Sequence, residues 1–153
     1  MADLQKITPF LWFDGRAQEA AEFYVSIFPD SRIVNSSPLP GVQAEGAALV
    51  SFVLAGQGFT ALDGGPMFQF SPAISFVINC ETQEEIDHYW FGLSKEGAQQ
   101  PGGWVEDKFG LSWQISPVQL ESLLAANPDK VMEALLQMKR IDLAALETAA
   151  NGE

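Results

Sequence analysis

Two stretches of the chain share one order of apolar and polar residues. A shift of 65 residues lays positions 14–24 over positions 79–89. Three identities support this overlay: Gln18/Gln83, Glu19/Glu84 and Tyr24/Tyr89. Each stretch follows an apolar run of strand length, residues 7–13 or 73–78, and then places apolar residues at helical spacing. The pattern predicts two related units that each begin with a strand and a helix.

The first unit is expected to continue with three strands. Its helix follows Asp14, which is a favourable N-cap residue, and ends at Pro29. The strands are expected at residues 31–35, 47–55 and 59–63, with a Pro/Gly loop at residues 38–41 before the second of them. The predicted order is strand, helix, strand, strand, strand.

The second unit repeats this order. Residues 73–80 predict its first strand, and residues 82–93 predict a helix that begins with a capping box of Thr82 and Glu85. The buried stripe of this helix is expected to be Ile86, Tyr89, Trp90 and Leu93. A short strand near residues 98–100 and a hairpin of residues 102–107 and 111–116 follow, with Gly110 suited to the left-handed position of the turn.

Helices are expected beyond the second unit. Ser116 with Pro117, Asn127 with Pro128, and Asp142 each form a helix-start signal. The expected buried stripe of the middle helix is Val131, Leu135 and Met138, widened by Met132 and Leu136. The sequence therefore predicts an α+β fold in one domain, residues 1–153, with units at about 3–66 and 71–116 and a helical tail at 117–153.

Charge and composition narrow the possible partners. The 153 residues include 20 acidic and 8 basic side chains, so the net charge of −12 repels phosphate and no nucleic acid is expected as a partner. Apolar runs such as residues 47–55 reach less than half of the ~20 residues that span a bilayer, so no membrane partner is expected. With a lone cysteine and no charged-then-apolar leader at residues 1–10, we expect a cytoplasmic protein.

Three kinds of reactive side chain have a simpler structural interpretation. His88 lies off the buried stripe and near Glu84, which indicates a solvated helix face. Cys80 ends an apolar strand, which favours burial over reactivity. Neighbouring carboxylates such as Glu106 and Asp107 point apart on a strand, so we expect them to be solvated rather than to act as an acid and a base.

Motifs spread over nearly the whole chain resemble one family. They are residues 7–15, 19–24, 28–31, 61–66, 76–80, 107–110 and 112–115, together with Trp104. With the tandem βαβββ units, they resemble the PhnB-like branch of the vicinal oxygen chelate superfamily, the fold of glyoxalase I, extradiol dioxygenases and the bleomycin and fosfomycin resistance proteins. Proteins of this branch are often labelled 3-demethylubiquinone-9 3-methyltransferase. The resemblance implies half-barrel sheets that close against each other or against a second chain, so we expect a homodimer.

The resemblance also implies a divalent metal held by His and Glu side chains from the first and last strands of each unit. Aligning the last-strand motif places Gln114 where metal-binding members have a glutamate, and its first-unit counterpart falls at or beside Leu62. The first-strand positions, near residues 9–10 and 74–75, hold no histidine. We therefore expect no bound metal. No glycine loop joins a strand to a helix as S-adenosylmethionine sites require, so no cofactor is expected either.

Alternation along the strands selects the candidate binding residues. One face of each first strand is expected to pack on a helix, which leaves the other face to line a concave cleft. The candidates are Phe10, Trp12, Leu62, Asp63, Ser75, Val77, Trp104 and Gln114. Aromatic walls with a few polar groups are typical of a small-molecule pocket. The same aromatic side chains could instead fill the barrel or a dimer interface.

Two functions from different classes remain open. In the first, the cleft binds a small, partly aromatic molecule without a metal. In the second, it catalyses a metal-free reaction, as an isomerase, a lyase or the labelled methyltransferase, with Gln114 orienting the substrate and Asp63 accepting a proton. We favour binding, because the sequence shows no nucleophile beside a base, no metal-ligand set and no cofactor loop. A scaffold with a filled cavity is a third possibility.

Overall fold

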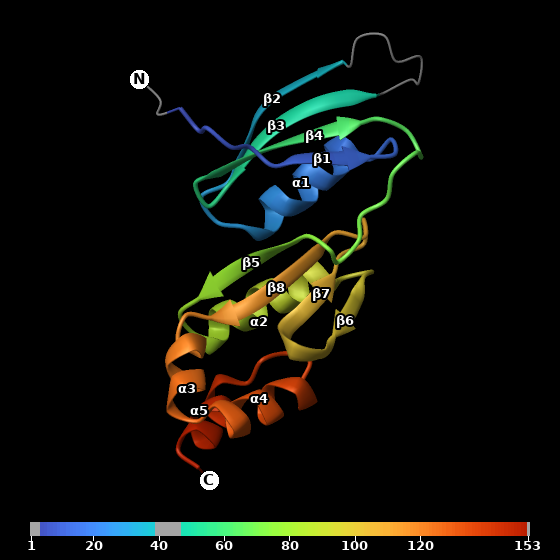
Figure 1. Cartoon of the computed structure of the whole chain (residues 1–153). Helices are drawn as coiled ribbons and strands as arrows, with labels where there is room; N and C mark the ends of the chain where they lie inside the picture. The colour runs from blue at the N-terminus through green and yellow to red at the C-terminus, as the bar shows by residue number, and fades with distance from the viewer. Residues whose placement is uncertain (1–3, 39–46, 153) are drawn as a thin grey trace. The chain divides into compact units, whose positions relative to one another are not determined.

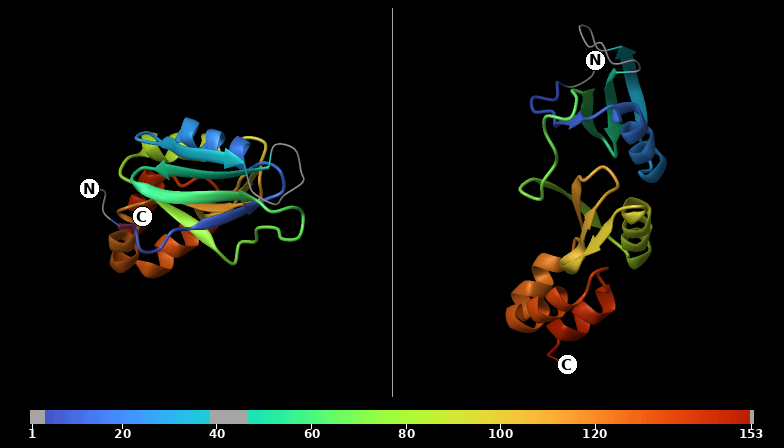
Figure 2. Two further views of the ribbon diagram at one scale, coloured as in Figure 1. Left: turned by 90° about the horizontal axis from the view of Figure 1, so that it is seen from above. Right: turned by 90° about the vertical axis from the view of Figure 1, so that its right-hand side faces the viewer.

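The structure, a computed structural model, describes residues 4–38 and 47–152. The chain divides into two compact units, Met1–Gln69 and Phe70–Glu153, so the helical tail belongs to the second unit. Each unit holds a four-stranded sheet with a helix on one face, as Figure 1 and the right-hand view of Figure 2 show. The predicted α+β class, with two βαβββ units and C-terminal helices, is confirmed. Most of the predicted loop at residues 38–41 lies outside the described residues.

The first unit forms one mixed sheet. Its elements are β1 (Phe10–Phe13), α1 (Ala17–Ile27), β2 (Arg32–Pro38), β3 (Ala48–Leu54) and β4 (Gln57–Asp63), with strand order β1-β4-β3-β2. β1 runs parallel to β4, and the other neighbours are antiparallel. The βαβ crossover between parallel strands needs a covering helix, which α1 supplies.

Alternate residues of these strands pack on α1. On β1 the buried residues are Leu11 and Phe13, whereas Phe10 is exposed. Phe52 of β3 stacks between two rings, with ring centroids 6.2 Å from Tyr24 of α1 and 5.4 Å from Phe59 of β4. One face of the sheet is therefore the core of the unit, and the opposite face carries no helix.

The start of α1 differs from the prediction. Asp14 does not cap the helix; the N-cap residue is Arg16, whose side chain makes no capping bond. Instead, Asp63 Oδ1, at the end of β4, accepts a hydrogen bond of 2.8 Å from the backbone N–H of Ala17. The first turn of a helix leaves N–H groups unpaired, and a carboxylate from elsewhere in the fold satisfies one here.

The second unit repeats the strand order with different lengths. Its elements are β5 (Ser75–Cys80), α2 (Gln83–Ser94), β6 (Ala98–Gln100), the 3₁₀ turn η1 (Pro101–Gly103), β7 (Trp104–Glu106) and β8 (Ser112–Pro117), with order β5-β8-β7-β6. The strand predicted from residue 102 begins only at Trp104, because Gly102 and Gly103 have φ values of 76° and 87° and form a turn. The predicted left-handed Gly110 is confirmed, with φ 90°.

The predicted N-cap of α2 is confirmed, but the return bond of the capping box goes to Glu81, the residue before the cap, rather than to Thr82. Thr82 Oγ1 accepts from the backbone N–H of Glu85 at 3.2 Å, and Glu85 Oε1 accepts from the backbone N–H of Glu81 at 2.7 Å. The predicted stripe of Ile86, Tyr89, Trp90 and Leu93 is buried as expected. This helix therefore starts from its own local sequence, unlike α1.

Three helices complete the second unit: α3 (Leu120–Ala126), α4 (Pro128–Gln137) and α5 (Leu143–Ala150). The predicted caps Asn127 and Asp142 are confirmed. No helix starts at Ser116, because Ser116 and Pro117 are part of β8. Met132 and Leu136 do not widen the buried stripe of α4; both are exposed. None of the described helices has both the length and the apolar character that a bilayer crossing requires.

Candidate functional site

The face of the first sheet opposite α1, called here the first helix-free face, carries three of the predicted residues. The register places Phe10 beside Thr60, and Trp12 beside Leu62. Phe10 is 59% exposed and Leu62 is half-buried. The structure therefore brings Phe10, Trp12 and Leu62 to one surface, which is mainly aromatic and aliphatic.

Trp12 is held by the segment that follows β4. Its indole Nε1 donates a hydrogen bond of 2.9 Å to the carbonyl oxygen of Gly65. Its ring meets Phe68 edge-on, with centroids 5.0 Å apart. A Cβ atom on Gly64 would lie 2.3 Å from the Trp12 ring, so only glycine fits there. Because its N–H is already bonded, Trp12 offers this face an apolar ring rather than a donor.

Asp63 lies on the other face of the sheet, which corrects its prediction as a cleft residue. It is 4% exposed, and its Oδ1 and Oδ2 accept from the backbone N–H groups of Ala17 at 2.8 Å and of Ala48 at 2.9 Å. Side chains alternate along a strand, so Asp63 points toward α1 when Leu62 points away from it. The carboxylate joins the start of α1 to β3, which is a structural role.

The corresponding face of the second sheet, the second helix-free face, carries the other four predicted residues. The register places Val77, Gln114 and Trp104 side by side in one row across β5, β8 and β7. Ser75 lies one row away, and its Oγ accepts a hydrogen bond of 2.9 Å from Gln114 Nε2. An aromatic ring, an amide and a hydroxyl are therefore neighbours on this face.

The sequence reasoning did not select two polar residues of this face, Glu106 and Gln100. The register places Glu106 beside Ser112, and Gln100 beside Trp104. Alternation from Trp104 along the strand would have identified Glu106, but Gln100 depends on the pairing of the short strand β6.

Asp107 contradicts the prediction of a solvated carboxylate. It is 2% exposed. Its Oδ1 accepts from the backbone N–H groups of Phe109 at 2.9 Å and Leu111 at 3.1 Å, and its Oδ2 accepts from Trp113 Nε1 at 2.8 Å. Aspartate commonly closes a turn by bonding to backbone N–H groups ahead of it. Asp107 therefore fixes the β7–β8 hairpin and is not a solvated carboxylate.

Cys80 and His88 have the structural settings that the sequence favoured. Burial, with a smaller contribution from the charge of Glu85, raises the pKa of the Cys80 thiol to about 12. The thiol is therefore protonated and a poor nucleophile near neutral pH. His88 lies on the exposed side of α2, with its ring 5.1 Å from that of Tyr89.

The donor set does not fit a divalent metal. The register confirms that Leu62 and Gln114 hold corresponding positions, because Trp12 pairs with Leu62 as Val77 pairs with Gln114. Neither side chain is an anionic ligand; Phe10 offers none to the first face, and Glu106 brings a single carboxylate to the second. Within residues 4–38 and 47–152, no group of three or more His, Cys, Asp or Glu side chains could hold an ion.

Comparison with known proteins places the chain among proteins of one fold. The family model described as 3-demethylubiquinone-9 3-methyltransferase matches residues 5–116. A structure described as a putative 3-demethylubiquinone-9 3-methyltransferase, PhnB protein, from Bacillus cereus is 40% identical; the match covers 74% of this chain and 100% of that one, with a TM-score of 0.69. No curated protein matches this sequence.

Two further structures are similar in fold. Protein PA1353 from Pseudomonas aeruginosa is 20% identical over 74% of this chain and 98% of that one, with a TM-score of 0.63. The fosfomycin resistance protein FosX from Listeria monocytogenes, in complex with Mn(II) and sulfate, is 15% identical over 75% of this chain and 91% of that one, with a TM-score of 0.54. These likenesses show the fold alone.

Proposed function

Since the chain belongs to the family described as 3-demethylubiquinone-9 3-methyltransferase, whose PhnB-like proteins have the vicinal oxygen chelate fold, we propose that it binds a small, partly aromatic organic molecule on its helix-free faces. One observation carries the proposal: Trp104 and Gln114 are neighbours in a single row of the second helix-free face, with the exposed Val77 beside them. A ring to stack on and an amide that both donates and accepts are the elements of a small-molecule site.

The first helix-free face supports the same class of ligand. Phe10 and Trp12 give it aromatic surface, and Leu62 adds an aliphatic contact. Since the indole N–H of Trp12 is bonded to Gly65, contacts with these three side chains are apolar. A molecule with an aromatic part matches this surface better than a fully polar one.

The proposed site contains no metal, because the side chains there are not a set of metal ligands. A divalent metal is held by several His or carboxylate side chains at one place, whereas Leu62 and Gln114 stand at the corresponding positions and Glu106 is a single carboxylate on the second helix-free face. We therefore expect the ligand to be bound by van der Waals contacts and hydrogen bonds, without a metal. Adding Mn²⁺ or Zn²⁺ to the protein is therefore expected to leave ligand affinity unchanged.

Thermal-shift measurements on a panel of small aromatic molecules test the proposal, with native mass spectrometry to detect any molecule that copurifies. A ligand at 100-fold excess over its Kd raises the free energy of unfolding by about 2.7 kcal/mol. Phe10→Ala and Trp104→Ala are expected to weaken binding at least about tenfold, the effect of losing an aromatic contact.

Phe91→Ala is the matched control. Phe91 lies on α2 and is 59% exposed, the same fraction as Phe10, but it belongs to neither helix-free face. Equal losses of affinity in Phe10→Ala and Phe91→Ala would refute binding at the first helix-free face.

A second function is a metal-free enzyme, an isomerase, a lyase or a methyltransferase, and the family description favours the last of these. Asp63 is not available as its proton acceptor, because both carboxylate oxygens accept backbone hydrogen bonds. Gln114 and Glu106 remain as polar groups for such a reaction. Mass spectrometry of a captured ligand after incubation with S-adenosylmethionine tests methyl transfer, which replaces a hydrogen by a methyl group, and lyase cleavage, which gives smaller products. Chromatography of the same ligand tests isomerisation, which changes its retention but not its mass, whereas binding alone changes neither.

We also propose that the chain forms a homodimer. Large apolar side chains remain exposed on or next to the helix-free faces, among them Phe10, Ile74 and Val77. Exposed apolar patches of this kind commonly mark protein interfaces. Sedimentation at micromolar concentration tests the proposal, and a monomer there would refute it.

A further inference from the structure

Residues 138–143, called here the strap, connect α4 to α5 and lie beyond the part of the chain that matches the family. On one side the strap is bonded to the turn η1. The backbone N–H of Gly102 donates to the carbonyl oxygen of Met138 at 2.8 Å, and that of Gly103 donates to the carbonyl oxygen of Lys139 at 2.9 Å. Two consecutive amides of the turn that precedes β7 are therefore held by the tail.

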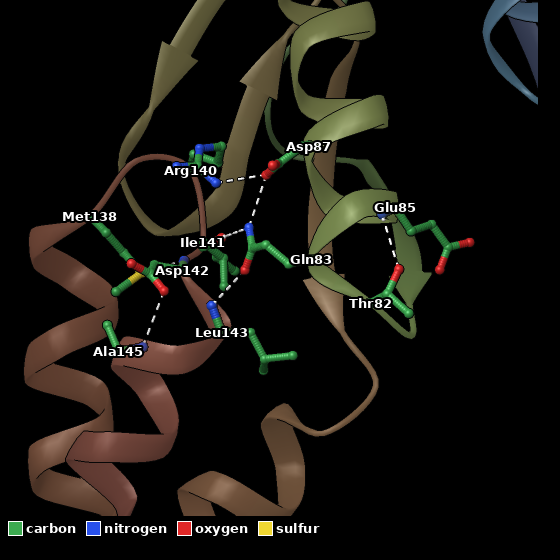
Figure 3. A network of polar contacts seen from close by, with 10 residues as sticks. All are labelled: Thr82, Gln83, Glu85, Asp87, Met138, Arg140, Ile141, Asp142, Leu143 and Ala145. Carbon is green, nitrogen blue, oxygen red and sulfur yellow. Dashed lines mark hydrogen bonds and ion pairs between the residues drawn. The ribbon is translucent and has the colours of Figure 1, made fainter.

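On its other side the strap is bonded to α2, as Figure 3 shows. Gln83 Nε2 donates to the carbonyl oxygen of Ile141 at 2.9 Å, and Gln83 Oε1 accepts from the backbone N–H of Leu143 at 2.8 Å. Arg140 Nη1 donates to Asp87 Oδ1 at 2.6 Å, and Gln83 Nε2 also donates to that oxygen. One glutamine and one ion pair fix the strap to the helix.

The strap also determines the space at Gly103. Ile141 is 1% exposed, and a Cβ atom on Gly103 would lie 2.7 Å from its Cδ1 atom and 2.9 Å from the carbonyl oxygen of Ile115. With φ at 87°, Gly103 adopts a conformation that side-chain-bearing residues rarely adopt. The turn is thus enclosed between the strap and β8.

Trp104, the first residue of β7, follows directly after this turn. A Cβ atom on Gly102 would lie 3.8 Å from Trp104 Cδ1, so the indole lies next to the turn, where a side chain on Gly102 would contact it. The same residue pairs with Gln114 on the second helix-free face. Gly102 and Gly103 therefore connect the strap to Trp104 directly along the backbone.

We propose that the strap is a positioning element that sets the orientation of Trp104 and thereby the affinity of the second helix-free face for its ligand. This inference rests on the proposed function for its consequence in binding. Its structural part, that the strap orders the Gly102–Gly103 turn and the Trp104 ring, is tested without any ligand.

The first experiment is nuclear magnetic resonance on the full ¹⁵N-labelled chain, with the variant Gln83→Ala/Arg140→Gln, which removes the bonds that fix the strap to α2. We expect the amide protons of Gly102 and Gly103 to exchange at least about tenfold faster than in the wild type, as for a locally opened segment. The indole signal of Trp104, assigned with Trp104→Phe, is expected to shift, whereas that of Trp113 stays in place.

Lys130→Gln is the matched control, because Lys130 Nζ donates to the carbonyl oxygen of Gly152 at 2.8 Å, a tail contact remote from the strap in sequence. It is expected to leave the three signals unchanged, and Arg140→Lys, which keeps the charge opposite Asp87, is expected to retain most of the wild-type behaviour. If the double variant does not fold, Arg140→Gln alone is measured in the same way. Unchanged Gly102, Gly103 and Trp104 signals in a folded strap variant overturn the inference.

The second experiment measures the Kd of anilinonaphthalene sulfonate, a fluorescent and partly aromatic probe. We expect the double variant to bind it at least about threefold more weakly than wild type, and Lys130→Gln to bind it equally well. If Trp104→Ala itself binds the probe as the wild type does, the proposed function of this face fails while the resonance data still decide whether the strap orders the turn. If Trp104→Ala weakens binding and the strap variant does not, the inference about affinity fails and the proposed function stands.

Discussion

The two sheets of this protein have the same strand order but opposite surface chemistry. Trp12 pairs with Leu62 in the first sheet, and Val77 pairs with Gln114 at the corresponding place in the second. The first helix-free face is mainly aromatic and aliphatic, with the hydroxyls of Thr60 and Ser51 in one row with Phe10, whereas the second places an amide, Gln114, beside Trp104. Backbone register has been kept between the repeats while the exposed side chains have diverged, because the register depends on the buried face.

The helices of the two units start by different means. In the second unit Thr82 caps the helix by accepting from Glu85, and the Glu85 side chain accepts from the nearby Glu81. In the first unit a residue from the end of the sheet, Asp63, bonds to the first turn of α1. One helix start is therefore a property of its own segment, and the other exists only in the folded unit.

Each unit has a buried aspartate that connects two segments of the chain through hydrogen bonds. Asp63 joins α1 and β3 through two backbone N–H groups. Asp107 closes the β7–β8 hairpin through two backbone N–H groups and the indole of Trp113. Hydrogen bonds to a carboxylate are stronger than those to a neutral acceptor, so each residue is a sensitive point of its unit.

The largest effect is expected for Asp107→Ala, which removes three hydrogen bonds, two of them buried and one part-buried. The free energy of unfolding should fall by about 4 kcal/mol, the sum of a few charge-assisted bonds reduced by relaxation. Urea denaturation measures it. Glu106→Ala, one position earlier and partly exposed, is the control and should cost less than about 1 kcal/mol. Similar losses in the two variants would show that the hairpin does not depend on Asp107.

Asp63→Ala should lower the free energy of unfolding by about 3 kcal/mol, because two buried bonds are lost rather than three. The effect should concentrate in the first unit, where hydrogen exchange of the α1 amides speeds up most. Glu22→Ala, on the exposed side of α1, is the control. Protection of the α1 amides equal to wild type would contradict the role of Asp63 at the helix start.

Alkaline pH should distinguish the units through Cys80, since the first unit has Gly15 at the corresponding position. Burial raises the pKa of the thiol from 9.0 to about 12, so the folded state disfavours the thiolate. This contribution to stability is complete below pH 9 and is lost as the pH rises toward 12. Relative to Cys80→Ala, the wild type should lose on the order of 1–2 kcal/mol between pH ~8 and pH ~10.5. Parallel stability curves for the two proteins would contradict the burial of the thiol.

The smallest effect is expected for Gln114→Glu, which gives the second helix-free face the carboxylate that metal-binding members of the superfamily carry. Partial burial disfavours the ionised form, although Ser75 can donate a hydrogen bond to it. The variant should be less stable at pH 8 than at pH 5 by less than about 1 kcal/mol, relative to wild type. Denaturation midpoints that shift equally at both pH values would place the side chain in full solvent contact. One carboxylate is not a ligand set, so no metal binding is expected.

Local features of the chain were read correctly because their causes are local. Four predicted features each depend on a few consecutive residues. They are the N-caps Thr82, Asn127 and Asp142 and the left-handed Gly110. The repeat added the correspondence of Leu62 and Gln114, which the strand register confirms.

The errors arose where distant residues decide the structure. Asp14 is a residue type that commonly caps helices. The hydrogen bond to the backbone N–H of Ala17 is nevertheless made by Asp63, 46 positions away. Asp107 was expected in solvent, since the sequence does not show that Trp113 and the hairpin amides converge on it. Met132 and Leu136 match the helical period but are exposed, because periodicity gives the phase of a stripe and not the width of the surface that covers it.

Residue patterns were sufficient to predict the α+β class, the two βαβββ units and the family, because alternation, caps and motifs depend on residues close together in the chain. The folded structure was needed to show which carboxylates are buried, that Asp63 lies outside the candidate site, and that residues 138–143 hold the turn before Trp104. These depend on hydrogen bonds between segments far apart in the chain, whose partners are set when the sheets and helices pack.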